Sequence, residues 1–173
     1  MILSREGLLA ILDANNVPTN RARFTAQDEI DGVTFGTIDP QWVQDSFEAW
    51  VETDRGTKLV ATRDIGGGKD ILVPNYIAPG YVCRHAAFRF FAHLIAGLAL
   101  RAAETTQAFD AYAIGVVYYT ATPRPEDKGR NGRHARIMFV ADDGTLRQFE
   151  EGDGSPEPMT PEELASITLW HVI

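Results

Sequence analysis

The stretch YVCRHAAFRFFAHL, residues 81–94, places the one cysteine of the chain where a glycine-flanked segment gives way to an apolar helix. Downstream of Cys83, apolar side chains recur at helical spacing and form one broad stripe: Ala87, Phe90, Phe91, Leu94, Ile95 and Leu98. A stripe of this width is typical of a helix that packs against a core. We therefore predict that this helix is the central and most buried one, and that Cys83 heads its buried side.

The segments around this helix predict an α+β fold. Capping signals start a helix after Ser4, a second from Asp39-Pro40 to about Thr53, and a short one at 160–163. Alternating or apolar runs predict strands at 57–63, 113–120, 135–141, 146–149 and 167–173, and 142–144 joins two of them into a hairpin. The runs 66–68, 123–133 and 150–158 have turn or loop composition. Helices followed by antiparallel strands define the α+β class.

Composition indicates one globular domain over 1–173, with a cap segment at 1–38 and the core at 39–173. A chain of 173 residues that is 45% hydrophobic can bury one sizeable core. The net charge of −8 repels phosphate backbones, so we expect no nucleic-acid partner. A single cysteine and no signal-peptide pattern predict a cytoplasmic protein. Charged or small residues interrupt 88–100, so we expect no membrane partner.

Three residues at predicted element boundaries form a candidate catalytic group: Cys83, His134 and Glu150. Unpaired N–H groups at a helix N-terminus favour a thiolate, so the pKa of Cys83 is expected below the free value of about 8.5. His134 starts one strand of the hairpin and Glu150 ends the other. We predict that these two lie nearly opposite each other, with His134 as base and acid and Glu150 orienting its ring. Glu151 or Asp153 takes the third place if the register slips.

The order of these motifs resembles the papain-like and transglutaminase-like superfamily of cysteine hydrolases, and most of all the papain-like C-terminal domain of fungal agglutinins. The resemblance rests on three segments in 40–173: Tyr81-Val82-Cys83-Arg84-His85-Ala86-Ala87-Phe88, Gly132-Arg133-His134-Ala135 and Phe149-Glu150-Glu151. It implies a papain/transglutaminase-like core. By analogy with a papain-like glutamine, it also implies that Asn75 holds the oxyanion together with the N–H of Cys83.

The chain departs from that family at several positions. Arg84 and His85 stand where the agglutinin-like group has paired acids that help bind calcium, and Arg133 separates Gly132 from His134. A calcium requirement is therefore not carried over. The departures leave open an inactive member of the family.

The leading functional prediction is a cysteine-dependent hydrolase or acyl transferase that acts on an amide bond, peptide or isopeptide, in a protein or peptide substrate through a thioester. We predict that Arg84 and Arg133 contribute to substrate binding near the cleft. Metal-ligand spacings are absent from the sequence, so we expect no metal and no cofactor. The alternative is a non-enzymatic interaction protein with a degenerate triad and an acidic partner-binding surface.

Overall fold

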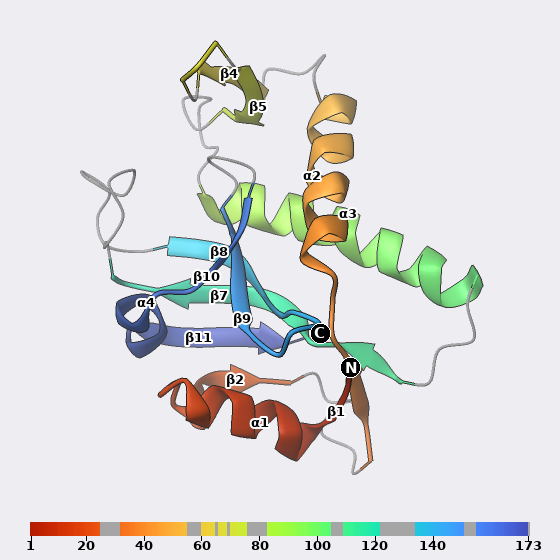
Figure 1. Ribbon diagram of the computed structural model, residues 1–173, viewed down its shortest axis with the longest axis vertical. Helices are drawn as coiled ribbons and strands as arrows, with labels where there is room; N and C mark the ends of the chain where they lie inside the picture. The colour runs from red at the N-terminus through yellow and green to blue at the C-terminus, as the bar shows by residue number, and fades with distance from the viewer. Residues whose placement is uncertain are drawn as a thin grey trace.

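The computed structural model describes residues 1–24, 32–54, 60–64, 66–68, 70–75, 83–104, 109–121, 134–150 and 155–172. The helices in this part of the chain are α1 (Arg5–Ala14), α2 (Pro40–Asp54), α3 (Cys83–Glu104), α4 (Pro161–Ala165) and the 3-10 turn η1 (Thr19–Arg21). Helices and strands occur together in an α+β arrangement, as the sequence predicts (Figure 1).

The main sheet has six strands in the order β10-β9-β8-β7-β11-β2. These strands are β10 (Ser155–Pro158), β9 (Leu146–Glu150), β8 (His134–Val140), β7 (Ile114–Tyr119), β11 (Ile167–Val172) and β2 (Ala22–Arg23). All neighbours are antiparallel except β11 and β2. A three-stranded sheet has the order β1 (Ile2–Ser4), β3 (Thr34–Gly36) and β6 (Ala111–Tyr112), and β4 (Val60–Asp64) pairs with β5 (Asp70–Pro74).

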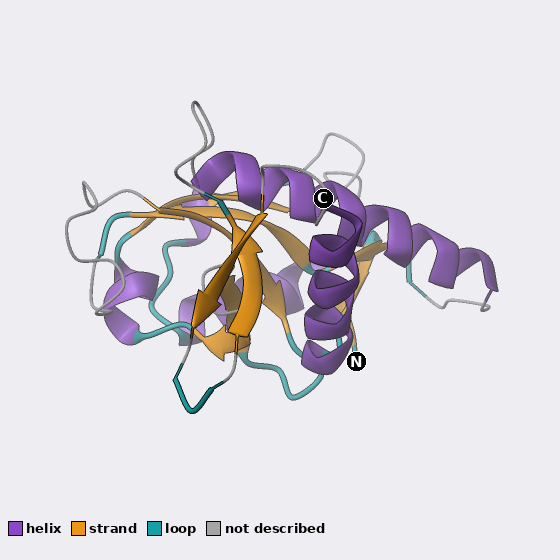
Figure 2. Ribbon diagram, turned by 90° about the horizontal axis from the view of Figure 1, so that it is seen from above, coloured by secondary structure: helices purple, strands orange, loops and turns teal. Residues whose placement is uncertain are grey.

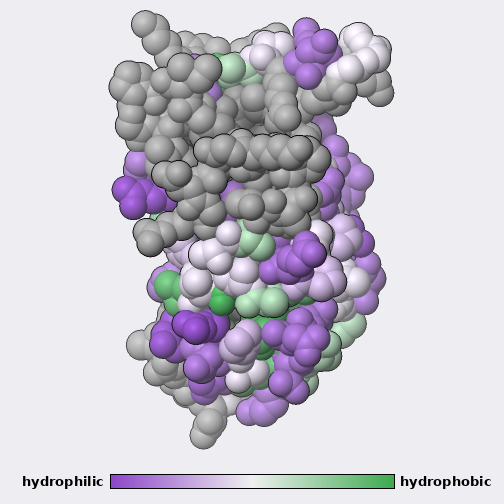
Figure 3. Space-filling view, turned by 90° about the vertical axis from the view of Figure 1, so that its left-hand side faces the viewer, coloured by the Kyte–Doolittle hydropathy of each residue, from purple (hydrophilic) through white to green (hydrophobic). Residues whose placement is uncertain are grey.

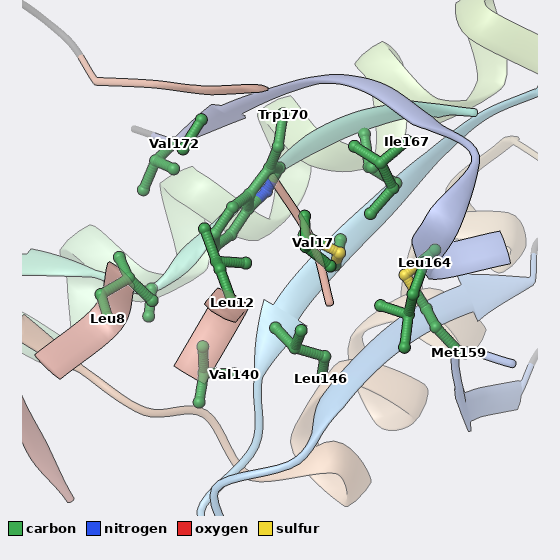
Figure 4. Packing of buried hydrophobic residues seen from close by; sticks show 14 of the residues in the cluster. Leu8, Leu12, Val17, Val140, Leu146, Met159, Leu164, Ile167, Trp170 and Val172 are labelled. Atoms are coloured by element: carbon green, nitrogen blue, oxygen red, sulfur yellow. The ribbon is translucent and has the colours of Figure 1, made fainter. Parts of the chain in front are cut away.

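Alternation along the central strands divides the core into two clusters on opposite faces of the sheet. The α1 cluster contains Leu8, Leu12, Val117, Tyr119, Met138, Val140, Leu146 and Trp170, among others (Figure 4). The α3 cluster contains Val43, Phe47, Trp50, Phe90, Leu94, Val116, Ala135, Ile137, Phe139 and Phe149, among others. Strands lie between α1 and α3, so each helix buries its apolar side against a different face (Figures 1 and 2).

Local signals explain where the helices begin. The Ser4 hydroxyl accepts a hydrogen bond from the Gly7 N–H and caps α1. The Asp39 carboxylate accepts from the Gln41 N–H at the start of α2, with Pro40 as the first helical residue. These contacts satisfy donors that a helix N-terminus otherwise leaves unpaired. The predicted starts of both helices are confirmed.

Helix α3 runs along β8 in the same direction as the strand. The Phe90 ring in its first half lies 4.9 Å from the Phe149 ring, centroid to centroid. Leu98, near its other end, lines a hollow with Ile38, which bridges to Ala141 just beyond β8. The predicted central helix is thus present, and it begins at the end of the sheet where β8 starts.

By length and composition α3 also meets the criteria for a membrane span. Over Arg84–Glu104 an 18-residue window has a mean hydropathy of 1.4, and 33% of that window is buried in the fold. A core helix passes the same test, and α3 does pack on the sheet.

Two strands lie where the sequence predicts none: one at 70–74, for which no element is predicted, and one at 155–158, which has loop composition. Residues 70–74 form β5, and Gly66, Gly67 and Gly68 make a tight turn between β4 and β5 with φ angles of 91°, 65° and 74°. Residues 155–158 form β10 despite Pro156 and Pro158. Because β10 is an edge strand, a proline there need not break the ladder by lacking an N–H.

The first 38 residues contribute to the core of the molecule. The side chains of Leu8 and Leu12 are fully buried in the same cluster as Val117 and Trp170. Strand β2 also pairs in parallel with β11, joining Ala22 to Trp170. The segment predicted as a cap therefore packs on one face of the main sheet and extends the sheet by one strand.

Candidate functional site

Cys83 and His134 lie at the same end of the sheet. The Phe90 ring contacts that of Phe149, and Phe149 pairs with Ile137 on β8. Cys83 lies seven residues before Phe90, about 10 Å of helix. His134 lies three residues before Ile137, also about 10 Å of strand. Measured along the direction of β8, the first residue of α3 and the first residue of β8 therefore lie at about the same position.

The His134 imidazole nevertheless lies on the α1 side of the sheet. His134 pairs with Tyr119, and the two rings stack with centroids 5.0 Å apart and planes inclined by 23°. Tyr119 belongs to the α1 cluster, whereas Ala135, the next residue on β8, belongs to the α3 cluster. His134 is only 3% exposed. The structure thus does not bring this imidazole to the side of the sheet on which α3 lies.

The strand register also differs from the predicted one. On β8 and β9, Ile137 pairs with Phe149 and Met138 with Gln148, without a bulge. Continued by one pair, this register sets Glu150 opposite Arg136. This is two residues along β8 from His134, so the predicted pairing of His134 with Glu150 is displaced by two residues in this bulge-free register, and the predicted role of Glu150 stays a prediction. The side chains of Cys83 and Glu150 are not among those that the structure describes.

The remaining predicted site residues are spread over several elements. Asn75 directly follows β5 and is half-buried, and Arg84 is exposed in the first turn of α3. The candidates Arg133, Glu151 and Asp153 lie outside the described residues. The described geometry therefore does not join Asn75 or Arg84 to His134.

His134 lies at the end of a row of buried polar side chains on the α1 face. The Arg136 guanidinium is 2% exposed and lies over the Tyr119 ring, 5.8 Å from its centroid. Further along the same face, the Gln148 amide donates a hydrogen bond of 2.8 Å to the fully buried Glu163 carboxylate. Buried polar groups cost stability unless they are paired. Here the stacking of His134 and Arg136 on Tyr119 joins β8 to β7, and the Gln148–Glu163 hydrogen bond joins β9 to α4.

A pocket of about 450 Å³ lies along the paired strands β7 and β11 and reaches the first residue of β8. We call it the β7–β11 pocket, and it is lined by Tyr118, Tyr119, Thr120, His134, Thr168, Leu169 and His171. His171 lies in the strand predicted at 167–173, and no motif in the sequence indicates a site there. Period-2 alternation would have marked the exposed positions of these strands, but it carries no information on which strands become neighbours.

The outer side of α2 carries a second chemical feature. Asp45, Glu48 and Glu52 are exposed at positions i, i+3 and i+7, so they share one side of the helix. No lysine or arginine occurs between Pro40 and Asp54. This acidic side of α2 faces away from the core, because Val43, Phe47 and Trp50 hold the opposite side against α3.

Within the described part of the chain, no group of three or more histidine, cysteine, aspartate or glutamate residues is placed to hold a metal ion. Comparisons with protein-family models, with curated proteins and with solved structures found no match to this chain.

Proposed function

We propose that this chain is a non-enzymatic interaction protein with a degenerate cysteine–histidine pair, and that the acidic side of α2 contacts a basic partner. The single observation that carries the proposal is the side of the sheet on which His134 lies. Its ring stacks on Tyr119 in the α1 cluster, while the helix that starts at Cys83 packs on the other face.

A catalytic imidazole must reach the proton that it transfers. A general base works within about 2.6–3.2 Å of its partner, or through one water. With the main sheet between its ring and α3, His134 is not placed to take a proton from a group at the start of that helix. Its burial among Tyr119 and Arg136 instead matches a packing role.

The acidic side of α2 supplies an attractive surface for a cation-rich partner. Asp45, Glu48 and Glu52 are exposed, and the chain as a whole carries a net charge of −8. The Asp54 carboxylate at the end of the helix is already bound by Arg89, at 2.6 Å. Clustered charges of one sign speed the encounter with a partner of opposite charge, and salt screens this attraction.

The first experiment tests the thiol. Alkylation of Cys83 by iodoacetamide is followed against pH in the wild-type protein and in His134→Ala. The proposal predicts the same pH profile in both, because the imidazole is not coupled to the thiol. A profile that titrates well below the free-thiol range of about 8.5 and shifts in His134→Ala would overturn it.

The second experiment tests the surface. Binding of a lysine- and arginine-rich peptide is measured by calorimetry at low and high salt, for the wild type and for the triple variant Asp45→Lys, Glu48→Lys, Glu52→Lys. Binding that weakens at least about tenfold in the variant is expected. The control, Glu6→Lys with Asp13→Lys on α1, changes the net charge in the same direction with two substitutions instead of three. A loss per substitution equal to that of the triple variant would show that only overall charge matters.

One observation favours a second candidate function: the first residues of α3 and β8 lie at about the same position along the sheet. In this case the chain would have a papain/transglutaminase-like core and would be a cysteine-dependent hydrolase or acyl transferase. The Cys83 thiolate would attack an amide carbonyl carbon, the amine would leave with a proton, and water or another amine would release the acyl group from the thioester. This function needs the His134 ring on the α3 side. Amide turnover that Cys83→Ser abolishes, with stability unchanged, would support it.

A further inference from the structure

We infer that the β7–β11 pocket binds an uncharged aromatic ring that carries a hydrogen-bonding group, either as a free small molecule or as a side chain of a peptide. The inference goes beyond the proposed function, because none of the pocket residues belongs to the acidic side of α2. It rests on how the two strands form the hollow and on the chemistry of the residues that line it.

The hollow forms at an irregularity in the pairing of β11 with β7. Ile167 pairs with Tyr119 and Leu169 with Tyr118, so Thr168 is an extra residue between two consecutive partners. The Thr168 hydroxyl donates a hydrogen bond of 3.1 Å to the Tyr118 carbonyl and holds this bulge in place. Bulges bend a strand and change the direction of its side chains, and they are common beside binding sites.

The bulge sets three side chains on one side of the sheet. After it, Leu169 and His171 pair with Tyr118 and Val116, which both contact the α3 cluster. Tyr118 and Leu169 are half-buried and His171 is exposed. The same strands thus continue the α3 face of the sheet as a surface that is still open to solvent.

The rings in the pocket have a geometry suited to another ring. The Tyr118 and His171 rings meet edge to face, with centroids 6.4 Å apart and planes inclined by 81°. Aromatic rings prefer such tilted contacts or offset stacking, and a third ring can extend the arrangement. Leu169 adds an alkyl wall. A volume of about 450 Å³ falls within the usual range for small-ligand pockets, roughly 300–1,000 Å³.

The lining explains why the ligand should be uncharged and carry a polar group. None of the seven lining residues in the described part of the chain is an aspartate, glutamate, lysine or arginine. A charged ligand would lose hydration against these seven residues without gaining an opposite charge from them. The exposed hydroxyls of Thr120 and Thr168 and the His171 imidazole can exchange hydrogen bonds with a phenol or an amide. A strand-like peptide is less suited, because β2 already pairs with Trp170 and His171 at the outer edge of β11.

Binding is tested by two-dimensional NMR with four probes: 4-methylphenol, N-acetyl-tyrosine amide, benzoate and benzylamine. We expect saturable shifts of the Tyr118, Leu169 and His171 signals with the first two, and dissociation constants at least about tenfold higher for the two charged probes. Tighter binding of the tyrosine amide than of the phenol would identify a peptide side chain as the ligand. Equal or weaker binding would identify a free small molecule.

Two variants locate the site. Leu169→Asp brings a charge to the pocket wall, and His171→Ala removes one exposed ring; each should weaken 4-methylphenol binding at least about tenfold. The matched control is Leu100→Asp on α3, where the leucine is 65% exposed and outside the pocket, and it should bind as the wild type does. Absence of saturable shifts, equal affinity for charged probes, or unchanged binding by a folded His171→Ala protein would each overturn the inference.

Discussion

At the scale of single residues, Gly115 shows how closely β7 and β11 approach each other. A Cβ atom at this position would overlap the carbonyl group of His171 and lie 2.9 Å from the Trp170 Nε1 atom. Both are in the neighbouring strand, and backbone atoms cannot move aside as the end of a flexible side chain can. Glycine is therefore required here by space, and the pairing that shapes the β7–β11 pocket depends on it.

We predict that Gly115→Ala lowers the free energy of unfolding by more than about 2 kcal/mol, because β7 and β11 must move apart to make room. Urea denaturation followed by circular dichroism measures this loss. The control is Gly7→Ala in α1, where the nearest atom to the new Cβ would be the Ser4 Oγ atom at 3.6 Å. Alanine favours helix, so this control should be neutral or stabilising. Similar losses in the two variants would contradict the packing argument.

Asp143, in the turn between β8 and β9, has a pKa well below the usual range of an aspartate. The hydroxyl and the N–H of Thr145 donate to its carboxylate, Arg147 adds an ion pair, and together they lower the pKa of Asp143 from 3.8 to about 2. Because the folded state holds the charged form, this contribution is complete above about pH 4. It is lost as the pH falls toward 2.

Asp143→Asn is expected to lower the free energy of unfolding at pH 7 by less than about 1 kcal/mol, since the side chain is 51% exposed and solvent screens it. The difference from wild type should shrink between pH 4 and 2, as measured by urea denaturation across that range. Thr145→Val keeps the charge and removes one donor, so its loss should be smaller over the same pH range. A difference that stays constant down to pH 2 would argue against this carboxylate as the titrating group.

At the scale of elements, the junction of α4 and β9 depends on one buried carboxylate. Glu163 accepts hydrogen bonds from the Thr160 N–H at 2.7 Å and the Gln148 amide at 2.8 Å, and its own N–H donates to the Thr160 hydroxyl. The capping box that the sequence predicts is thus confirmed. What the pattern did not indicate is that the same glutamate is fully buried and ties α4 to the sheet.

Glu163→Ala should lower the free energy of unfolding by about 2 kcal/mol or more. The substitution removes the reciprocal cap and leaves the buried Gln148 amide without this acceptor. Thermal and urea denaturation both report the change. The neighbouring Glu162, exposed in the same helical turn, is the matched control, and Glu162→Ala should cost less than about 1 kcal/mol. Equal losses of stability from the two substitutions would mean that the negative charge at the start of α4, and not the buried hydrogen bonds of Glu163, stabilises the fold.

At the scale of the whole molecule, the two clusters share the strands between them. Val116 and Ile137 belong to the α3 cluster, while Val117 and Met138, their neighbours on the same strands, belong to the α1 cluster. Losing β7 or β8 would expose both faces at once. The two layers should therefore fold and unfold together.

We predict a single cooperative unfolding transition, with a calorimetric enthalpy equal to the van't Hoff enthalpy. Leu12→Ala in the α1 cluster and Phe90→Ala in the α3 cluster should each lower stability by about 2–5 kcal/mol and shift that one transition. Phe88→Ala is the control, since Phe88 is 48% exposed and its loss should be small. Two resolved transitions, each moved by only one of the core variants, would show that the layers are independent.

The sequence by itself determined the helices and the β8–β9 hairpin. The stripe from Ala87 to Leu98, the caps at Ser4 and Thr160, and the turn at 142–144 act within a few residues, so local patterns identify them. The same patterns missed β2 and β10, because strands of two to four residues become strands only through partners supplied by the rest of the fold.

Only the tertiary structure decided the site. Alternation shows that His134 and Ala135 point to opposite faces, but not which of the two faces α3 covers. Packing makes that choice: Phe90 and Leu94 of α3 lie in the same cluster as Ile137, and the His134 imidazole lies with Tyr119 on the far side. The pairing of β11 with β7 is likewise non-local. It forms the pocket around Leu169 and His171, which no sequence motif predicts. Side-chain periodicity is a property of one strand, whereas a site depends on which faces and edges meet.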